Sequence, residues 1–210
     1  GYSTALSGKW HLGRGENTHP FRRGFDEYYG LLDGCCNFFN PVQRDPAFKG
    51  ARVRVLGDGR KPLKSFPDDF YMTDAITDHA VNSIRDFARG DAPFLVHVCY
   101  TAPHYPLHAK PEDIARYKDR YLGGWDELRD ERHARMVSMG LIDPKWKRPG
   151  RESRVGPWEK EKHKEWQALR MAVYAAMIDS MDQGIGRILK ALDDSGVAEE
   201  TLVLFLSDNG

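Results

Sequence analysis

Helical spacing of hydrophobic residues marks two stretches of the chain. Apolar side chains recur every three or four positions over residues 72–87, which predicts an amphipathic helix that begins just after an acidic pair. The same spacing over residues 166–192 predicts a second, longer helix, and Gly196 supplies the left-handed position that commonly ends a helix. Each helix is therefore expected to bury one face and to expose the other.

Nearly continuous apolar runs mark two strands. Residues 94–100 and 201–206 carry apolar side chains at almost every position, as expected of parallel strands buried on both faces. Prolines and glycines interrupt residues 40–67, which predicts a loop or hairpin region with a short edge strand at residues 52–56. The alternation of helix and buried strand predicts an α/β fold with a mostly parallel central sheet flanked by helices.

Length and charge limit the classes of protein to be considered. The 210 residues suffice for one domain or part of a larger one, and both ends look internal, so we expect a segment of a longer protein with an incomplete fold. Thirty-one basic residues balance thirty-one acidic ones, which argues against a nucleic-acid partner. No apolar run approaches the roughly 20 residues of a membrane-spanning helix, so we expect no membrane span in this segment.

A lysine and a histidine lie two residues apart near the start of the chain, between two glycines. If this segment is extended, Lys9 and His11 point to the same side, while Gly8 and Gly13 allow the backbone to bend tightly. An ammonium beside an imidazole is a plausible clamp for a tetrahedral anion. The alternative is a glycine-bounded surface turn, and the residue types alone leave both interpretations open.

Polar residues also follow both predicted strands. His104 comes after residues 94–100 and lies between two prolines, and Asp208 with Asn209 comes after residues 201–206. Ligands of open α/β sheets bind at the carboxyl ends of the strands. The carboxylate and amide oxygens suit Ca²⁺ or Mg²⁺, although Asp-Asn-Gly is also a turn sequence. His104 is either a site residue or a hydrogen-bonded residue of a rigid loop.

These three segments resemble signatures of the sulfatase family, within the alkaline-phosphatase-like superfamily. The matching patterns are Gly-Tyr-Ser-Thr with Gly-Lys-Trp-His-Leu-Gly, then Ala-Pro-His-Tyr-Pro-Leu-His, then Asp-Asn-Gly, in the order that sulfatases use. The resemblance implies that Lys9 contacts the sulfate oxygens, that His11 hydrogen-bonds the nucleophile, and that His104 contacts the sulfate and the leaving-group oxygen. It also implies that Asp208 and Asn209 bind calcium, with magnesium as the other possibility.

The family's nucleophile is formylglycine, an aldehyde hydrate that a formylglycine-generating enzyme makes from cysteine or serine. Cys35 and Cys36 are adjacent, and the residues after Cys36 do not match the family's activation motif, so neither is expected to be this nucleophile. Cys99 lies within an apolar run and is expected to be a small core residue. We therefore expect the nucleophile and the remaining metal ligands upstream of this segment and a second active-site lysine downstream, which would leave the segment alone inactive.

The resemblance implies that residues 1–210 are part of one sulfatase catalytic domain, whose parent protein hydrolyses sulfate esters of a small molecule or a glycan. The alternatives are a phosphonate or phosphate ester hydrolase of the same superfamily, or a non-catalytic protein that binds sulfated glycans. Relatives are typically periplasmic or secreted. Residues 109–164 are densely charged, and they form either a substrate-selecting insertion or a solvated cover anchored by tryptophans.

Four other histidines are expected to have structural or peripheral positions. His19 is expected to face solvent, and His79 is expected at the surface of the first helix or packed beside it. His97 is expected to satisfy a buried hydrogen bond within its strand, and His108 to lie at the rim of the site.

Overall fold

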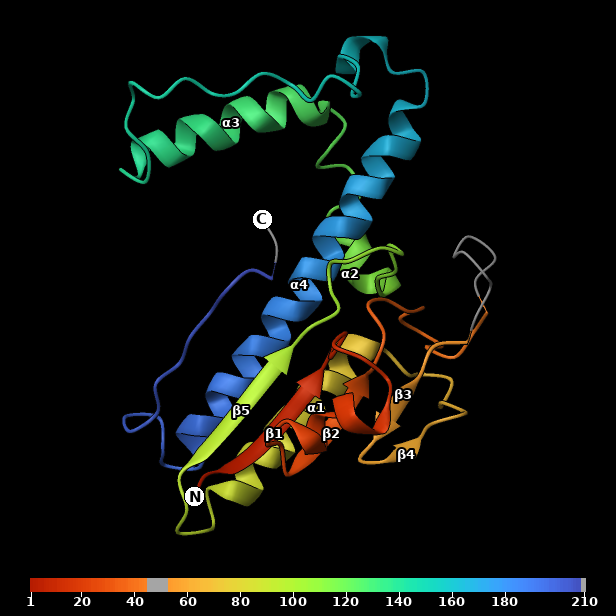
Figure 1. Cartoon of the computed structure of the whole chain (residues 1–210). Helices are drawn as coiled ribbons and strands as arrows, with labels where there is room; N and C mark the ends of the chain where they lie inside the picture. Colours follow the sequence, from red (N-terminus) through yellow and green to blue (C-terminus); the bar gives the residue numbers. More distant parts are fainter. Residues whose placement is uncertain (45–52, 209–210) are drawn as a thin grey trace. The chain divides into compact units, whose positions relative to one another are not determined.

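The computed structural model describes residues 1–44 and 53–208 (Figure 1). The chain divides into two compact units. The first, which we call the sheet unit, comprises Gly1–His108 and Ile178–Gly210. The second unit comprises Ala109–Met177.

The sheet unit is built on a five-stranded mixed sheet in the order β4-β3-β2-β1-β5. Its strands are β1 Ser3–Gly8, β2 Glu27–Leu31, β3 Leu56–Asp58, β4 Lys61–Pro62 and β5 Phe94–Cys99. The central strand β1 runs parallel to both β2 and β5, whereas β3 and β4 form an antiparallel hairpin beside β2 (Figure 1). The predicted α/β fold is therefore confirmed, with a hairpin at one edge of the sheet.

Helices cover one face of the sheet and short irregular segments cover the other. Helix α1 (Met72–Phe87) matches the predicted bounds, and it packs against β1 and β5. Helix α4 (Lys164–Asp194) contributes its last turns to the same core, and the chain leaves it through Gly196 at φ 70°. This core comprises Val81, Ile84, Ala191 and Leu192 with Phe94, Val96, Ile188, Val197 and Ala198.

The opposite face of the sheet is covered by the chain between β1 and β2. This segment contains the 3₁₀ turns η1 (Glu16–Thr18) and η2 (Pro20–Arg22). Its aromatic rings pack over the side chain of Leu6, which alternation along β1 directs away from α1. The cluster comprises Leu6, Tyr28 and Leu32 with Trp10, Phe21, Phe25 and Val55.

The prediction of two doubly buried strands is wrong in two respects. Residues 201–206 form no strand, and the five side chains from Leu202 to Leu206 are 55–83% exposed. Strand β5 forms as predicted, but Leu95 on it is 53% exposed. Among the described residues, no strand pairs with 201–206, and only β1 pairs with β5. A strand is buried on both faces only when other elements cover both faces. Phe94 and Val96 of β5 pack in the core with α1, whereas Leu95 between them points to the opposite face.

The expected edge strand at residues 52–56 begins only at Leu56, and Arg52 lies outside the described residues. The hairpin expected in this region is present as β3 and β4. None of the described helices is both long and apolar enough to cross a membrane.

The second unit contains α2 (Pro111–Ala115), α3 (Gly124–Ser138), the 3₁₀ turn η3 (Trp158–Lys160) and the first turns of α4. The rings of Trp125 and Trp158 pack edge to face with their centroids 4.7 Å apart, and Trp158 is 8% exposed. Trp146, by contrast, is 65% exposed. Two of the tryptophans therefore anchor this charged unit, and substrate selection by residues 109–164 stays a prediction.

A candidate oxyanion-binding site

The carboxyl end of β1 approaches β5 unusually closely. Gly8 has φ 119°, and a Cβ atom there would lie 1.9 Å from the carbonyl oxygen of Cys99. Only glycine therefore fits this position. The next residue is held in the same way, because the Lys9 amide donates to the Cys99 carbonyl at 2.7 Å. The backbone of Lys9 is thus fixed at the sheet edge where the ligand site is predicted.

Beyond Lys9 the chain turns sharply instead of continuing as a strand. The Trp10 amide donates to Leu31 at 2.8 Å, and its indole Nε1 donates to the Thr18 carbonyl at 2.8 Å. His11 then takes the left-handed conformation, with φ 55°. The condition under which Lys9 and His11 would share one side of a strand is therefore not met. A turn presents both side chains at the end of β1.

The first and last motifs of the chain meet in space. Lys9 Nζ donates to Asp208 Oδ2 at 3.0 Å across 199 positions of sequence. The side chain of Lys9 is 15% exposed, whereas that of Asp208 is 73% exposed. A mostly buried ammonium thus has its charged end beside an exposed carboxylate.

His104 lies in a turn directly after β5. Its amide donates to Thr101 at 2.9 Å, and ring atom Nδ1 lies 2.7 Å from the carbonyl oxygen of Tyr105. Because a carbonyl oxygen only accepts, Nδ1 carries the hydrogen of this bond. The opposite ring atom, Nε2, is then the one that can take up or release a proton.

The pKa of Asp208 shows that the four predicted site residues within the described part of the chain lie close to one another. The hydrogen bond from Lys9 and the charge of Lys9 hold the pKa of the Asp208 carboxyl below its usual value, and the His11 and His104 rings act in the same direction. The structure therefore brings together Lys9, His11, His104 and Asp208. The fifth predicted residue, Asn209, lies outside the described residues.

Two of the three cysteines, Cys36 and Cys99, have thiols with raised pKa values. Burial raises the pKa of the Cys36 thiol to about 12. Burial, together with the carboxylate of Asp208, raises the pKa of Cys99 to about 11. Thiols with such pKa values carry little thiolate at neutral pH. None of the three cysteines, all of which lie in the described residues, is in a disulfide, and Cys99 is half-buried rather than fully in the core.

The four histidines that were expected to have structural or peripheral positions do not join this cluster. His79 is half-buried, and its Nδ1 lies 2.6 Å from the hydroxyl of Ser7, so it packs beside the helix as expected. His97 is exposed and contacts the thiol of the nearby β5 cysteine at 3.2 Å, which contradicts the expected burial. His19 is half-buried against the rings of Phe21 and Tyr28. His108 packs on the rings of Phe38 and Phe39, which precede α1.

One pair of charged residues beside the cluster has no signal in the sequence. Arg14 Nη2 donates to Asp33 Oδ2 at 2.5 Å, and the Asp33 side chain is only 1% exposed. The two residues are 19 positions apart, and no pattern in the sequence relates one to the other. Only the fold reveals that they meet.

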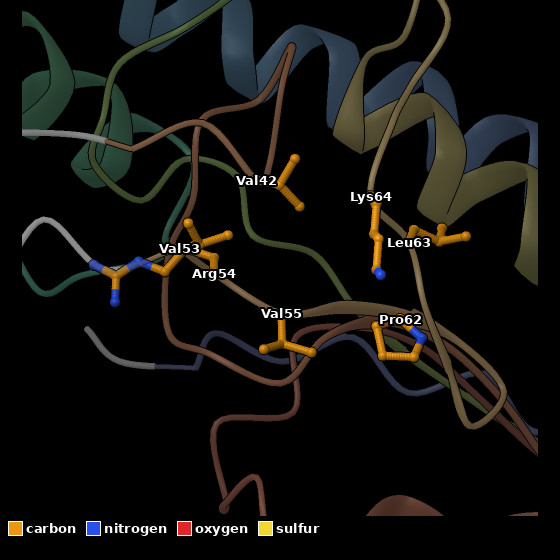
Figure 2. A pocket seen from close by; sticks show the side chains of 7 residues that line it. All are labelled: Val42, Val53, Arg54, Val55, Pro62, Leu63 and Lys64. Carbon is orange, nitrogen blue, oxygen red and sulfur yellow. The ribbon is translucent and has the colours of Figure 1, made fainter.

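A cavity of about 280 Å³ lies elsewhere on the sheet unit (Figure 2). It contains none of the predicted site residues. Its lining is mainly apolar and comprises Val42, Val53, Arg54, Val55, Pro62, Leu63 and Lys64. The cluster around Lys9 is instead open to solvent, since both of its histidines and Asp208 are exposed.

An ammonium, two imidazoles and a carboxylate lie near one another at one edge of the mixed sheet of an α/β protein. The sulfatase family model matches residues 1–210. An arylsulfatase of Klebsiella aerogenes is 35% identical over 220 residues, an alignment that takes in all of this chain and 45% of the relative. An uncharacterized sulfatase of Schizosaccharomyces pombe is 34% identical over all of this chain and 39% of its own length. The chain belongs to the sulfatase family, and it spans less than half the length of these relatives.

Solved structures share the fold. The crystal structure of Ps i-CgsB in complex with k-i-k-neocarrahexaose matches 93% of this chain and 34% of that chain, with a TM-score of 0.58 and 29% identity. BT4656, in complex with D-glucosamine-2-N,6-O-disulfate, matches 94% of this chain and 45% of that chain, with a TM-score of 0.56 and 19% identity. The second likeness concerns the fold alone.

Proposed function

We propose that the protein carrying this chain hydrolyses sulfate esters at the cluster around Lys9. One observation carries the proposal. The Lys9–Asp208 contact at 3.0 Å joins the two ends of a chain whose whole length matches the sulfatase family. The charges of His11 and His104 both act on the same carboxylate. A tetrahedral anion therefore finds a cation and two ring donors in one place.

Lys9 stabilises the negative charge on the sulfuryl oxygens. Its side chain is mostly buried, and a charge partly shielded from water acts more strongly on nearby oxygens. The fixed backbone of Lys9 means that little reorganisation accompanies the reaction. His11, from the same turn, hydrogen-bonds the nucleophile and orients it.

His104 protonates the leaving group. Its Nδ1–H is committed to the Tyr105 carbonyl, which fixes the orientation of the ring and assigns proton transfer to Nε2. When the sulfur–oxygen bond breaks, this atom gives its proton to the departing alkoxide or phenoxide.

Asp208 and Asn209 are the residues that would hold a divalent cation, Ca²⁺ first and Mg²⁺ second. Their carboxylate and amide oxygens fit a hard cation, and the Asp208 carboxylate is exposed beside Lys9. The described residues contain no cluster of three acidic, histidine or cysteine ligands, so further ligands would come from other parts of the protein. When bound, the cation would polarise a nonbridging sulfate oxygen.

We assign the nucleophile to a formylglycine outside these 210 residues, made by a formylglycine-generating enzyme. The raised pKa values of Cys36 and Cys99 support this assignment, because neither thiol is activated. A periplasmic or secreted location accompanies the proposal.

The proposed substrate class is a sulfated glycan or an aryl sulfate. The relatives include an arylsulfatase, and a solved relative at 29% identity is described with a bound neocarrahexaose. The charged second unit, with its exposed Trp146, is the proposed selector between these substrates.

The test uses the full-length parent protein, coexpressed with a formylglycine-generating enzyme and supplied with Ca²⁺. We expect it to cleave 4-nitrophenyl sulfate or a sulfated oligosaccharide. It should cleave the matched phosphate monoester much more slowly, because the phosphate ester carries nearly two negative charges and the sulfate ester one. Faster cleavage of the phosphate or phosphonate ester would favour the alternative hydrolase. Binding of sulfated glycan without turnover would favour a non-catalytic protein.

A further inference from the structure

His11 occupies a backbone conformation that needs support from its surroundings. Its φ is 55°, and no other residue except glycine has a positive φ in the described part of the chain. L-residues with side chains adopt this region rarely, and such positions persist only when neighbouring contacts hold them. The hydrogen bonds of Trp10 hold the residue before His11. Other contacts must hold the ring of His11 and the residues after it.

The backbone of Gly34 lies directly against the His11 ring, and we call this contact surface the Gly34 shelf. A Cβ atom built at Gly34 would lie 2.5 Å from Cε1, 2.7 Å from Nε2 and 2.9 Å from Nδ1 of His11. Real side-chain contacts are not that short, so any residue larger than glycine would displace the ring. Gly34 does not have a positive φ, and the requirement for glycine here is one of space.

Asp33, the residue before Gly34, connects this segment to the turn that contains His11. Its buried carboxylate accepts from Arg14 at 2.5 Å and from the Val55 amide at 2.9 Å, and Arg54 lies 3.9 Å away. Arg14 is three residues after His11, and Asp33 immediately precedes Gly34. One ionic contact therefore holds the two segments that meet at the His11 ring.

We propose that Gly34 and Asp33 are positioning residues for His11, with Arg14 as the link between the two loops. The inference rests on the proposed function, since it concerns the orientation of a side chain in that site. Gly34 sets how far the ring can approach the loop, and the Arg14–Asp33 contact prevents the loop from moving away. Neither residue touches the reacting atoms in this assignment.

The test compares Gly34→Ala with Gly15→Ala in the matured full-length protein. Gly15 lies in the same turn, has φ −73°, and a Cβ there would be 3.7 Å from its nearest neighbour, so it is a matched control. We expect Gly34→Ala to lower kcat for an aryl sulfate by about 10- to 100-fold, with KM changed by less than about threefold, because misplacement by about 1 Å has effects of this size. Gly15→Ala should retain wild-type kcat.

Arg14→Gln provides a second variant if Gly34→Ala does not fold. In this variant the Val55 amide and Arg54 remain beside the buried Asp33 carboxylate, and we expect the same fall in kcat with KM retained. A purely structural role would lower the thermal midpoint while leaving kcat per folded molecule unchanged. Unchanged kcat in the folded variants would overturn the proposal.

A second readout separates this inference from the sulfatase assignment. In the full-length protein, with histidine Cε1 labelled and the His11 signal identified by its loss in His11→Gln, Gly34→Ala or Arg14→Gln should shift that signal and Gly15→Ala should not. If the wild type cleaves no sulfate ester, the proposed function fails, and this signal still decides the positioning role. An unmoved His11 signal in both variants would refute it.

Discussion

Lys9→Ala removes the ammonium that we place on the sulfuryl oxygens while leaving the sheet beneath it intact. Only 15% of the Lys9 side chain is exposed, so its charge acts in a partly water-excluded position. Removal of one preorganised electrostatic donor typically lowers kcat by about 10²- to 10³-fold. We expect a loss in this range for sulfate ester hydrolysis.

The same change should have little effect on stability. The partner carboxylate of Lys9 belongs to Asp208, whose side chain is 73% exposed, so solvent reaches the ion pair from the Asp208 side and the pair adds little to the free energy of unfolding. The backbone contacts of Lys9 do not involve its side chain and remain in the variant. Activity and stability should therefore separate, with a large fall in kcat and a thermal midpoint close to that of the wild type.

The assay measures kcat and KM for 4-nitrophenyl sulfate, with thermal unfolding of the same samples. Lys9→Arg retains the charge with a different shape and should recover part of the rate. Lys64→Ala removes an exposed lysine at the separate cavity and should behave as the wild type. The reasoning is refuted if Lys9→Ala retains kcat within about threefold, far less than loss of a preorganised donor produces.

Three further outcomes are expected of the full-length protein. His104→Asn should slow an alkyl sulfate at least about tenfold more than 4-nitrophenyl sulfate, because the poorer leaving group depends more on protonation; equal losses would contradict its role. A chelator should abolish turnover and Ca²⁺ restore it, and Asp208→Asn should need more Ca²⁺ for half-maximal rate; chelator-resistant turnover would exclude the metal. Burial lowers the pKa of His79 below 6.5, so the unfolded state binds more protons just under that pH. Urea midpoints should therefore fall from about pH 7.5 to about pH 5.5, and His79→Gln should flatten this dependence.

Local spacing predicted the helices well because the bounds of α1 depend mainly on its own apolar stripe. The same kind of local pattern wrongly predicted a buried strand at residues 201–206, where the side chains from Leu202 to Leu206 are exposed. An apolar run shows that a segment can be buried, while the neighbours that bury it lie elsewhere in the fold. The partial exposure of β5 has the same origin, since Leu95 points to the face opposite the α1 core and its own sequence does not supply the element that would cover it.

The candidate site shows a similar division. Lys9 with His11 was predicted from an ammonium and an imidazole between two glycines, and His104 and Asp208 were predicted from their places after two expected strands. The resemblance to the sulfatase signatures joined these three segments into one candidate site. The left-handed turn at His11 and the Gly34 shelf were not predicted, because they depend on a contact across 23 positions between two loops. Residue types predict the chemistry of such a site, whereas tertiary contacts determine the orientation of its side chains.

The exposed run Leu202–Leu206 affects whether this polypeptide would self-associate in solution. Five large apolar side chains in a row, without proline or charge, have the composition of segments that stack into intermolecular sheets. The 210 residues studied by themselves should therefore self-associate through this run. The same association would pull on Asp208, two positions further along, and so would disturb the cation site and the ion pair of Lys9 together.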